Sequence, residues 1–97
     1  MVPRVNWFAI VTPKVIDTRY FRYGRSGVRM TDGWIARSDD RPGGWYLESS
    51  LKYAHRWGSR EAAESIAVVV GGFLPGLMGK MSVVEVKKIM NGWRRVG

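Results

Sequence analysis

A single segment of the chain has apolar residues spaced with the period of an α-helix. One helix can cover only part of any sheet that the rest of the chain forms. Within residues 58–72, GSREAAESIAVVVGG, apolar residues recur with the spacing i, i+3, i+4 and i+7. These residues are Ala63, Ile66, Ala67 and Val70. Ser59 precedes them as a natural N-cap, and two consecutive glycines follow as a helix end. The pattern predicts one amphipathic helix at about 59–71, with Val68 and Val69 widening its apolar stripe.

Turn residues divide the rest of the chain into short apolar segments, as in an antiparallel meander. Strands are predicted at residues 6–12, 15–23, 33–37, 44–48 and 81–89. The resulting order, β-β-β-β-α-β, predicts a small α+β fold in which one helix packs on an antiparallel sheet. One helix covers only one face of such a sheet. The other face must be solvated, be covered by the chain itself, or bind a partner.

The length of 97 residues predicts a single domain, with residues 1–5 and 90–97 as flexible tails. The longest apolar run, residues 66–79, is interrupted by glycine and proline, and it is shorter than the roughly 20 residues that span a bilayer. The chain contains no cysteine, which fits a reducing compartment. We therefore expect a soluble cytoplasmic protein without a membrane partner.

The charge balance of the chain favours an acidic or polyanionic partner. Sixteen Lys and Arg residues against eight Asp and Glu residues give a net charge of +8. A net charge of about 2–8 is ordinary for a small soluble domain, so charge alone does not establish binding. Arginine accounts for most of these cations, and its guanidinium matches phosphate and carboxylate groups and stacks on aromatic rings.

Two segments concentrate this charge. The first is RYFRYGR, residues 19–25, where cations alternate with aromatic rings and would lie on both faces of a strand. The second lies near residues 87–95 and contains no acid. They predict a basic-aromatic binding surface, while a solvated strand face and a frayed tail stay open as the alternative. The predicted binding residues are Arg19, Tyr20, Arg22, Tyr23, Arg25, Arg29, Lys87, Lys88, Arg94 and Arg95.

The sequence does not predict a catalytic site. Acid–base catalysis by the single histidine, His55, would need a partner carboxylate and a pocket. Glu85 and Lys87 resemble half of the metal-binding motif of restriction-endonuclease-like nucleases, which also requires an acid on a neighbouring strand. The chain holds no acidic residue between Glu64 and Glu85. We therefore expect no enzymatic activity, no metal site and no cofactor.

Residues 45–86 follow a recognisable pattern. A short strand leads to a polar turn with an alanine and an aromatic residue, then to a Ser-Arg-Glu-Ala helix start and a closing Val-rich strand. The residues that carry this pattern are Trp45, Ala54, Trp57, Ser59, Arg60, Glu61, Ala62 and residues 84–86. In this part the chain resembles small accessory proteins of phages and prophages.

The resemblance implies a protein that acts by stoichiometric binding in the cytoplasm of a host cell. Anti-CRISPR inhibitors, which block a host nucleoprotein defence complex, are one such class. A strongly basic protein is a poor DNA mimic, so it would cover an acidic protein surface or grip a guide or target strand. Direct, sequence-tolerant nucleic-acid binding is the alternative function. A homodimer formed through the apolar loop at 71–79 also stays open.

Overall fold

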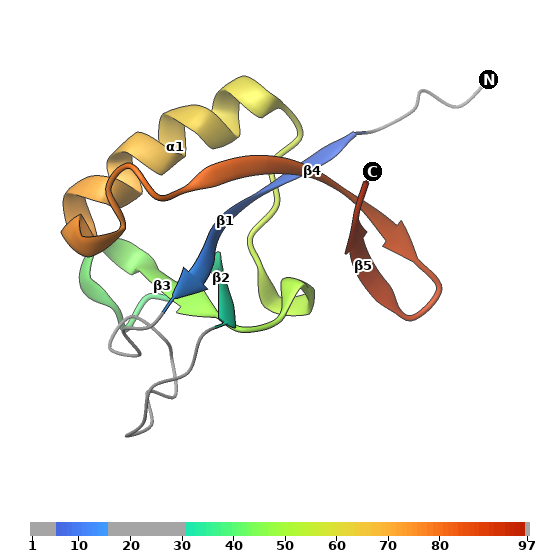
Figure 1. The fold of residues 1–97 in the computed structure, drawn as a ribbon, viewed down its shortest axis with the longest axis horizontal. Coiled ribbons are helices and arrows are strands. Elements are labelled where there is room, and N and C mark those ends of the chain that lie inside the picture. Colours follow the sequence, from blue (N-terminus) through green and yellow to red (C-terminus); the bar gives the residue numbers. More distant parts are fainter. Residues whose placement is uncertain (1–5, 16–30, 97) are drawn as a thin grey trace.

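The computed structural model of the chain describes residues 6–15 and 31–96. In this part of the chain, five strands form one antiparallel sheet and one α-helix packs on it (Figure 1). The strands are β1 (Trp7–Val15), β2 (Thr31–Arg37), β3 (Trp45–Glu48), β4 (Ser82–Ile89) and β5 (Gly92–Arg95), and the helix is α1 (Arg60–Phe73). The predicted α+β fold, an antiparallel sheet with one packed helix, is confirmed.

The strands lie in the order β3-β2-β1-β4-β5, so that β1 occupies the centre of the sheet. Its neighbours are β2, with Val11 opposite Trp34, and β4, with Trp7 opposite Val86. Because successive side chains of a strand point to opposite faces, β1 supplies apolar residues to both sides of the sheet. Ile10 lies on the helix face, and Val11 lies on the other face.

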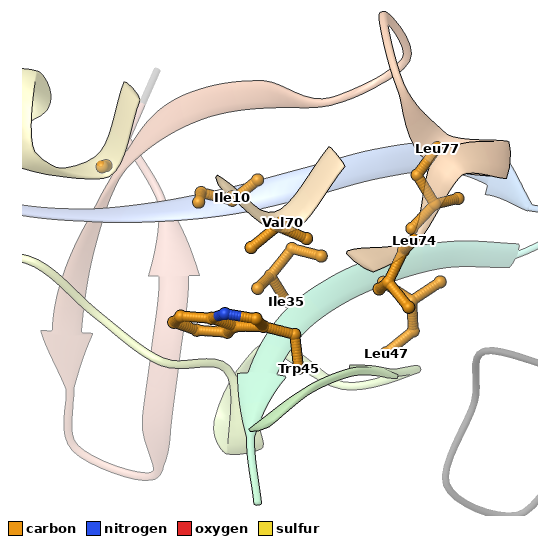
Figure 2. Packing of buried hydrophobic residues seen from close by; sticks show 8 residues of the cluster. Ile10, Ile35, Trp45, Leu47, Val70, Leu74 and Leu77 are labelled. Carbon is orange, nitrogen blue, oxygen red and sulfur yellow. The ribbon is translucent and has the colours of Figure 1, made fainter. Parts of the chain in front are cut away.

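The larger core lies between α1 and the sheet (Figure 2). The helix begins as predicted, because the Ser59 hydroxyl accepts a hydrogen bond of 3.1 Å from the backbone N–H of Ala62. Arg60 then ties the helix to β4 by donating a hydrogen bond of 3.2 Å to the carbonyl of Val83. The buried residues of this core are Ile10, Ile35, Trp45, Leu47, Ala63, Val70, Leu74 and Leu77.

The second face of the sheet is covered by the chain itself. A 3₁₀ turn at Leu51–Tyr53 follows β3, and Leu51 packs on this face. Trp93 of β5 packs there as well. The buried members of this smaller cluster are Ala9, Val11, Trp34, Ala54 and Val86. Of the three alternatives for the face without a helix, the described residues show coverage by the chain itself.

Residues 55–57 close the end of the sheet where β1 and β2 no longer pair. The N–H of His55 donates to the carbonyl of Ile35 at 2.9 Å. Two residues later, Trp57 and Phe8 exchange backbone hydrogen bonds of 2.8 and 2.9 Å, which form an isolated bridge beside β1. This segment therefore leads the chain from the second face to the start of α1 while satisfying backbone groups of both strands.

Several predicted boundaries differ from the structure. The first strand does not stop at Pro13 but continues to Val15 through an irregular register, where Lys14 has a positive φ of 54° and its N–H donates to Asp32 at 3.3 Å. Proline is tolerated at such bulges because its missing N–H is not needed for pairing. Apart from Val15, the strand predicted at 15–23 lies outside the described residues.

The helix and the residues after it also differ from the prediction. The helix continues through the two glycines to Phe73, and Val68 and Val69 face solvent instead of widening the apolar stripe. Leu74 and Leu77, expected in an exposed loop, are buried in the core. This leaves Phe73 and Met78 as the exposed large apolar residues of the 71–79 segment, and a homodimer through it stays a prediction.

The segment predicted to be a C-terminal flexible tail, residues 90–97, instead contains a strand. β5 (Gly92–Arg95) pairs antiparallel with the end of β4 and forms a hairpin. Residues 1–5, the other predicted tail, lie outside the described residues. No helix in the described ranges has the length and apolar character required to cross a membrane.

Candidate functional site

The second of the two predicted basic segments forms a defined surface. Lys87, Lys88, Arg94 and Arg95 all lie on the hairpin of β4 and β5, which we call the basic hairpin. The six predicted residues of the first segment lie outside the described part of the chain, at Arg19, Tyr20, Arg22, Tyr23, Arg25 and Arg29. The candidate site is therefore built from the basic hairpin and the residues that support it.

The strand register distributes the four cations over both faces of the basic hairpin. Lys87 lies directly opposite Arg94, so these two side chains share one face. Lys88 lies opposite Trp93, and Arg95 lies opposite Val86, which places Lys88 and Arg95 on the other face. All four cations are exposed. Like charges placed directly opposite each other destabilise a sheet, so the Lys87–Arg94 pair does not contribute to the stability of the hairpin.

None of the four cations forms an ion pair within residues 6–15 and 31–96. Glu85 stands two positions before Lys87 on the same face of β4. Four exposed cations on one short hairpin produce a local positive potential that attracts anionic groups.

The basic hairpin extends beyond the rest of the sheet. The pairing of β1 with β4 ends at Trp7 and Val86, and from Lys87 onward β4 pairs with β5 alone in the described structure. In Figure 1 the hairpin projects at the right of the view, away from α1 and β3. Near the tip, Lys87, Lys88 and Arg94 are exposed, whereas Trp93 on the second face packs against Trp7 and Arg56.

The tip of the basic hairpin is a two-residue loop. Ile89 pairs with Gly92, and Met90 and Asn91 connect them. Gly92 has a φ of +145°, which favours glycine over residues with a side chain. Met90 is 98% exposed, the highest fraction among the large apolar side chains described, and Ile89 is also exposed. The outermost part of this basic surface is thus apolar.

Trp93, which lies opposite Lys88 and one pair from the loop, fixes the basic hairpin to the body of the protein. Its ring packs edge-on against Trp7, with the centroids 6.3 Å apart and the planes at 87°. The guanidinium of Arg56 lies over the same ring, 4.0 Å from its centroid, and donates weak hydrogen bonds to the carbonyls of Leu51 and Lys52 at 3.4 and 3.5 Å. Burial lowers the pKa of Arg56, yet a guanidinium stays charged at neutral pH. Arg56 therefore adds a fifth cation beside the hairpin.

Met90, Trp93 and Arg56 were not predicted as site residues. The dipeptide Asn91-Gly92, which lies between two segments with β-branched and aromatic residues, is a common hairpin signal and could have identified the turn. The contact between Arg56 and Trp93 has no signal in the sequence, because these residues come from distant segments that only the folded sheet brings together.

The single histidine belongs to a separate aromatic cluster. His55 lies between Trp45 and Trp57, with ring centroids 6.2 and 4.6 Å away. Partial burial of the imidazole lowers the pKa of His55 below its ordinary value of 6.5, and the positive charges of Arg37 and Arg56 lower it further. Among the described residues, no carboxylate takes part in this cluster.

The lowered pKa of His55 predicts a pH dependence of stability. The unfolded chain takes up a proton near pH 6.5, whereas the folded chain does so only at lower pH. The contribution of His55 is therefore complete above about pH 6.5 and is lost as the pH falls toward the folded pKa. Urea unfolding of the parent at about pH 7.5 and 5.5 should give a lower midpoint at the acidic pH. The variant His55→Phe keeps a ring and should show a smaller difference; an equal difference would contradict the assignment.

The described residues contain no group of three or more His, Asp or Glu side chains that could hold a metal ion. Glu85 and Lys87 do lie on one face of β4, as the half-motif of a nuclease requires. However, no second acid joins Glu85 in a cluster within the described ranges.

Comparison of the chain with protein-family models, with curated proteins and with solved structures finds no match in any of the three. The resemblance of residues 45–86 to small phage and prophage accessory proteins stays a prediction.

Proposed function

We propose that this protein binds nucleic acid stoichiometrically, without catalysis and without strong sequence preference, through the basic hairpin. The observation that carries the proposal is a set of four exposed cations that form no ion pair within the described part of the chain. The β4–β5 register places them on both faces of a projecting hairpin. Phosphate groups along a strand are spaced closely enough for several of these cations to bind at once. The cations contact the backbone and not the base edges, so little sequence preference is expected.

The aromatic residues support this role by positioning the hairpin. Trp93 is packed against Trp7 and beneath Arg56, so its ring holds the hairpin in place. A pre-positioned hairpin loses less conformational entropy on binding than a flexible basic tail would. Arg56 lies beside the hairpin and extends the positive surface toward the sheet.

The proposal predicts a steep salt dependence. Four phosphate contacts correspond to a slope of roughly −3 to −4 in a plot of log affinity against log salt concentration. Raising the salt from about 50 to about 200 mM should weaken binding to a labelled oligonucleotide about 100-fold. Lys87→Ser and Arg94→Ser should each reduce the magnitude of the slope by about one unit.

A matched control is provided by Lys80, an exposed lysine that lies outside the basic hairpin. Lys80→Ser removes the same charge from the protein and should leave both the affinity and the slope close to those of the parent. If Lys87→Ser and Arg94→Ser behave like Lys80→Ser, the hairpin is not the interface. If the parent does not bind oligonucleotides even at low salt, the proposed function is wrong.

Inhibition of a host nucleoprotein defence complex, which the resemblance implies, is compatible with the same surface. Such a complex carries a guide or target strand that the basic hairpin would grip. No contact among the described residues favours this role over direct nucleic-acid binding, so it stays a prediction. Binding to such a complex that survives nuclease treatment would favour the inhibitor.

A further inference from the structure

The apolar tip of the basic hairpin is not used by the proposed function. Hairpin loops usually carry Gly, Asn, Asp or Ser, whereas here Met90 is the first loop residue and is almost completely exposed. Ile89 adjoins it and is exposed as well. Neither side chain contributes to either core cluster. An exposed apolar tip next to exposed cations is the composition expected of a side chain that inserts into an anionic target.

The arrangement of the cations indicates the shape of the target. Lys87 and Arg94 lie on one face of the hairpin, and Lys88 and Arg95 lie on the other. A ribbon with cations on both faces fits a groove whose two walls carry phosphates, which is the geometry of a nucleic-acid duplex. A two-stranded β-ribbon also has the dimensions to enter such a groove.

The length of the basic hairpin suits this placement. Trp93, opposite Lys88, is packed against Trp7 and Arg56, and Met90 stands two residues beyond Lys88. At about 3.3 Å per residue the tip projects roughly 7 Å beyond these contacts. The grooves of B-DNA are about 8 Å deep, so the projecting tip is comparable in length to the groove depth.

We infer, on the basis of the proposed function, that the basic hairpin enters a groove of double-stranded DNA and that Met90 inserts between adjacent base pairs. Apolar side chains that insert in this way partly unstack the bases and kink the duplex by about 20–90°. Methionine is suited to the role because its unbranched, flexible side chain adapts to an irregular gap. The flanking cations hold the phosphates on both sides of the kink.

A membrane surface is the other target that combines apolar and anionic groups, and the structure favours it less. The aromatic residues of a membrane-binding segment lie at the level of the lipid headgroups. Trp93, the aromatic residue of the hairpin, is turned back against Trp7 and Arg56 and is not available at the tip. Two apolar side chains, Ile89 and Met90, offer little area for insertion into lipid.

The test is a bending assay on the full chain. A duplex of about 20 base pairs with a flexible TA step at its centre carries a donor and an acceptor dye at its two ends. Saturating parent protein should raise the energy transfer between the dyes. Met90→Ala should lose more than half of this change while its affinity falls less than about tenfold, because the phosphate contacts remain. Met90→Leu should retain most of the change.

The matched control is Met78→Ala, which removes the same side chain from an exposed site outside the hairpin, 64% exposed. Its energy transfer should equal that of the parent. Because Met90 lies outside both core clusters, thermal unfolding of Met90→Ala should also match the parent, which separates a lost insertion from a lost fold.

The outcomes separate the insertion of Met90 from the proposed function. The insertion of Met90 is wrong if the parent binds the duplex with the expected salt dependence but without a change in energy transfer. It is also wrong if Met90→Ala bends DNA like the parent. In both cases the proposal of nucleic-acid binding stands. If the parent binds neither the duplex nor its single strand at low salt, both are wrong. Binding to vesicles of anionic phospholipid that Met90→Ala abolishes, without DNA bending, would assign the tip to a membrane.

Discussion

Replacing Val70 by aspartate should leave the chain largely unfolded at room temperature. Val70 is completely buried on α1, between the helix and the residues that β1, β2 and β3 contribute to the core (Figure 2). The variant would either bury a carboxylate without a partner or open the core, and each costs several kcal/mol. Domains of this size have a free energy of unfolding of only about 5–15 kcal/mol. Circular dichroism and urea unfolding would measure the loss.

Val68 provides the matched control, because it is the same residue type on the same helix and is 79% exposed. Val68→Asp should change the free energy of unfolding by no more than about 0.5 kcal/mol. The comparison isolates burial from helix propensity, since both variants exchange valine for aspartate in the interior of α1. Equal stability of the two variants would show that the assigned face of the helix is wrong.

Replacing Gly43 by alanine is expected to have the second-largest effect. Gly43 lies in the turn before β3 with a φ of +67° and a ψ of −1°, which strains residues with a Cβ atom. A Cβ at this position would also overlap Cγ of Phe73, so the ring would have to move. Backbone strain and overpacking together should cost about 3 kcal/mol of stability, measured by urea unfolding.

Two further variants separate the two causes of this loss of stability, which are backbone strain and the clash with Phe73. Gly58→Ala should be nearly neutral, because a Cβ at Gly58 meets no atom within 4 Å and no positive φ is required there. Adding Phe73→Ala to Gly43→Ala should recover the part of the loss that comes from the clash and leave the backbone strain. If Gly43→Ala is as stable as the parent, the close approach of Phe73 to this turn is not present in solution.

The helix and its core face follow from local signals in the sequence. Ser59 is an N-cap residue whose hydroxyl does bind a backbone N–H, and the apolar spacing places Ala63 and Val70 inward. The helix end was predicted too early because two glycines are usually terminators. Here Gly71 stays helical and buried, and a Cβ at this position would lie 3.6 Å from Met81 and 3.8 Å from Met78. Tertiary packing next to the glycine overrides its intrinsic preference.

The last strand could not be predicted with the same rules. β5 has one apolar side chain among polar ones, Trp93, so it lacks the alternation that identifies a half-buried strand. Its position depends on the contacts of Trp93 with Trp7 and Arg56, which are distant in the sequence. The Asn91-Gly92 dipeptide indicates a turn but does not indicate what the following residues pack against.

The candidate site was predictable in composition but not in geometry. The concentration of cations around Lys87 and Arg94 is visible in the sequence, and it correctly indicates a local positive surface. These two residues lie directly opposite each other because of the strand register. A register shift of one residue would turn the side chains of one strand to the other face. The exposed apolar tip at Met90 is not predicted from the sequence, because residues 90–97 are expected to form a flexible tail, and a flexible tail has no fixed tip.

The central position of β1 has a consequence for how the chain reaches its fold. β1 pairs with β4 through contacts such as Trp7 with Val86 and Val11 with Ser82, which join residues roughly 70 to 80 positions apart. Loop closure of this length makes folding slow, on a scale of milliseconds to seconds. During synthesis β1 leaves the ribosome long before β4, so one of its edges stays unpaired in the interval. An uncovered apolar edge of this kind recruits other chains, and the time until β4 arrives therefore determines how readily the nascent protein aggregates.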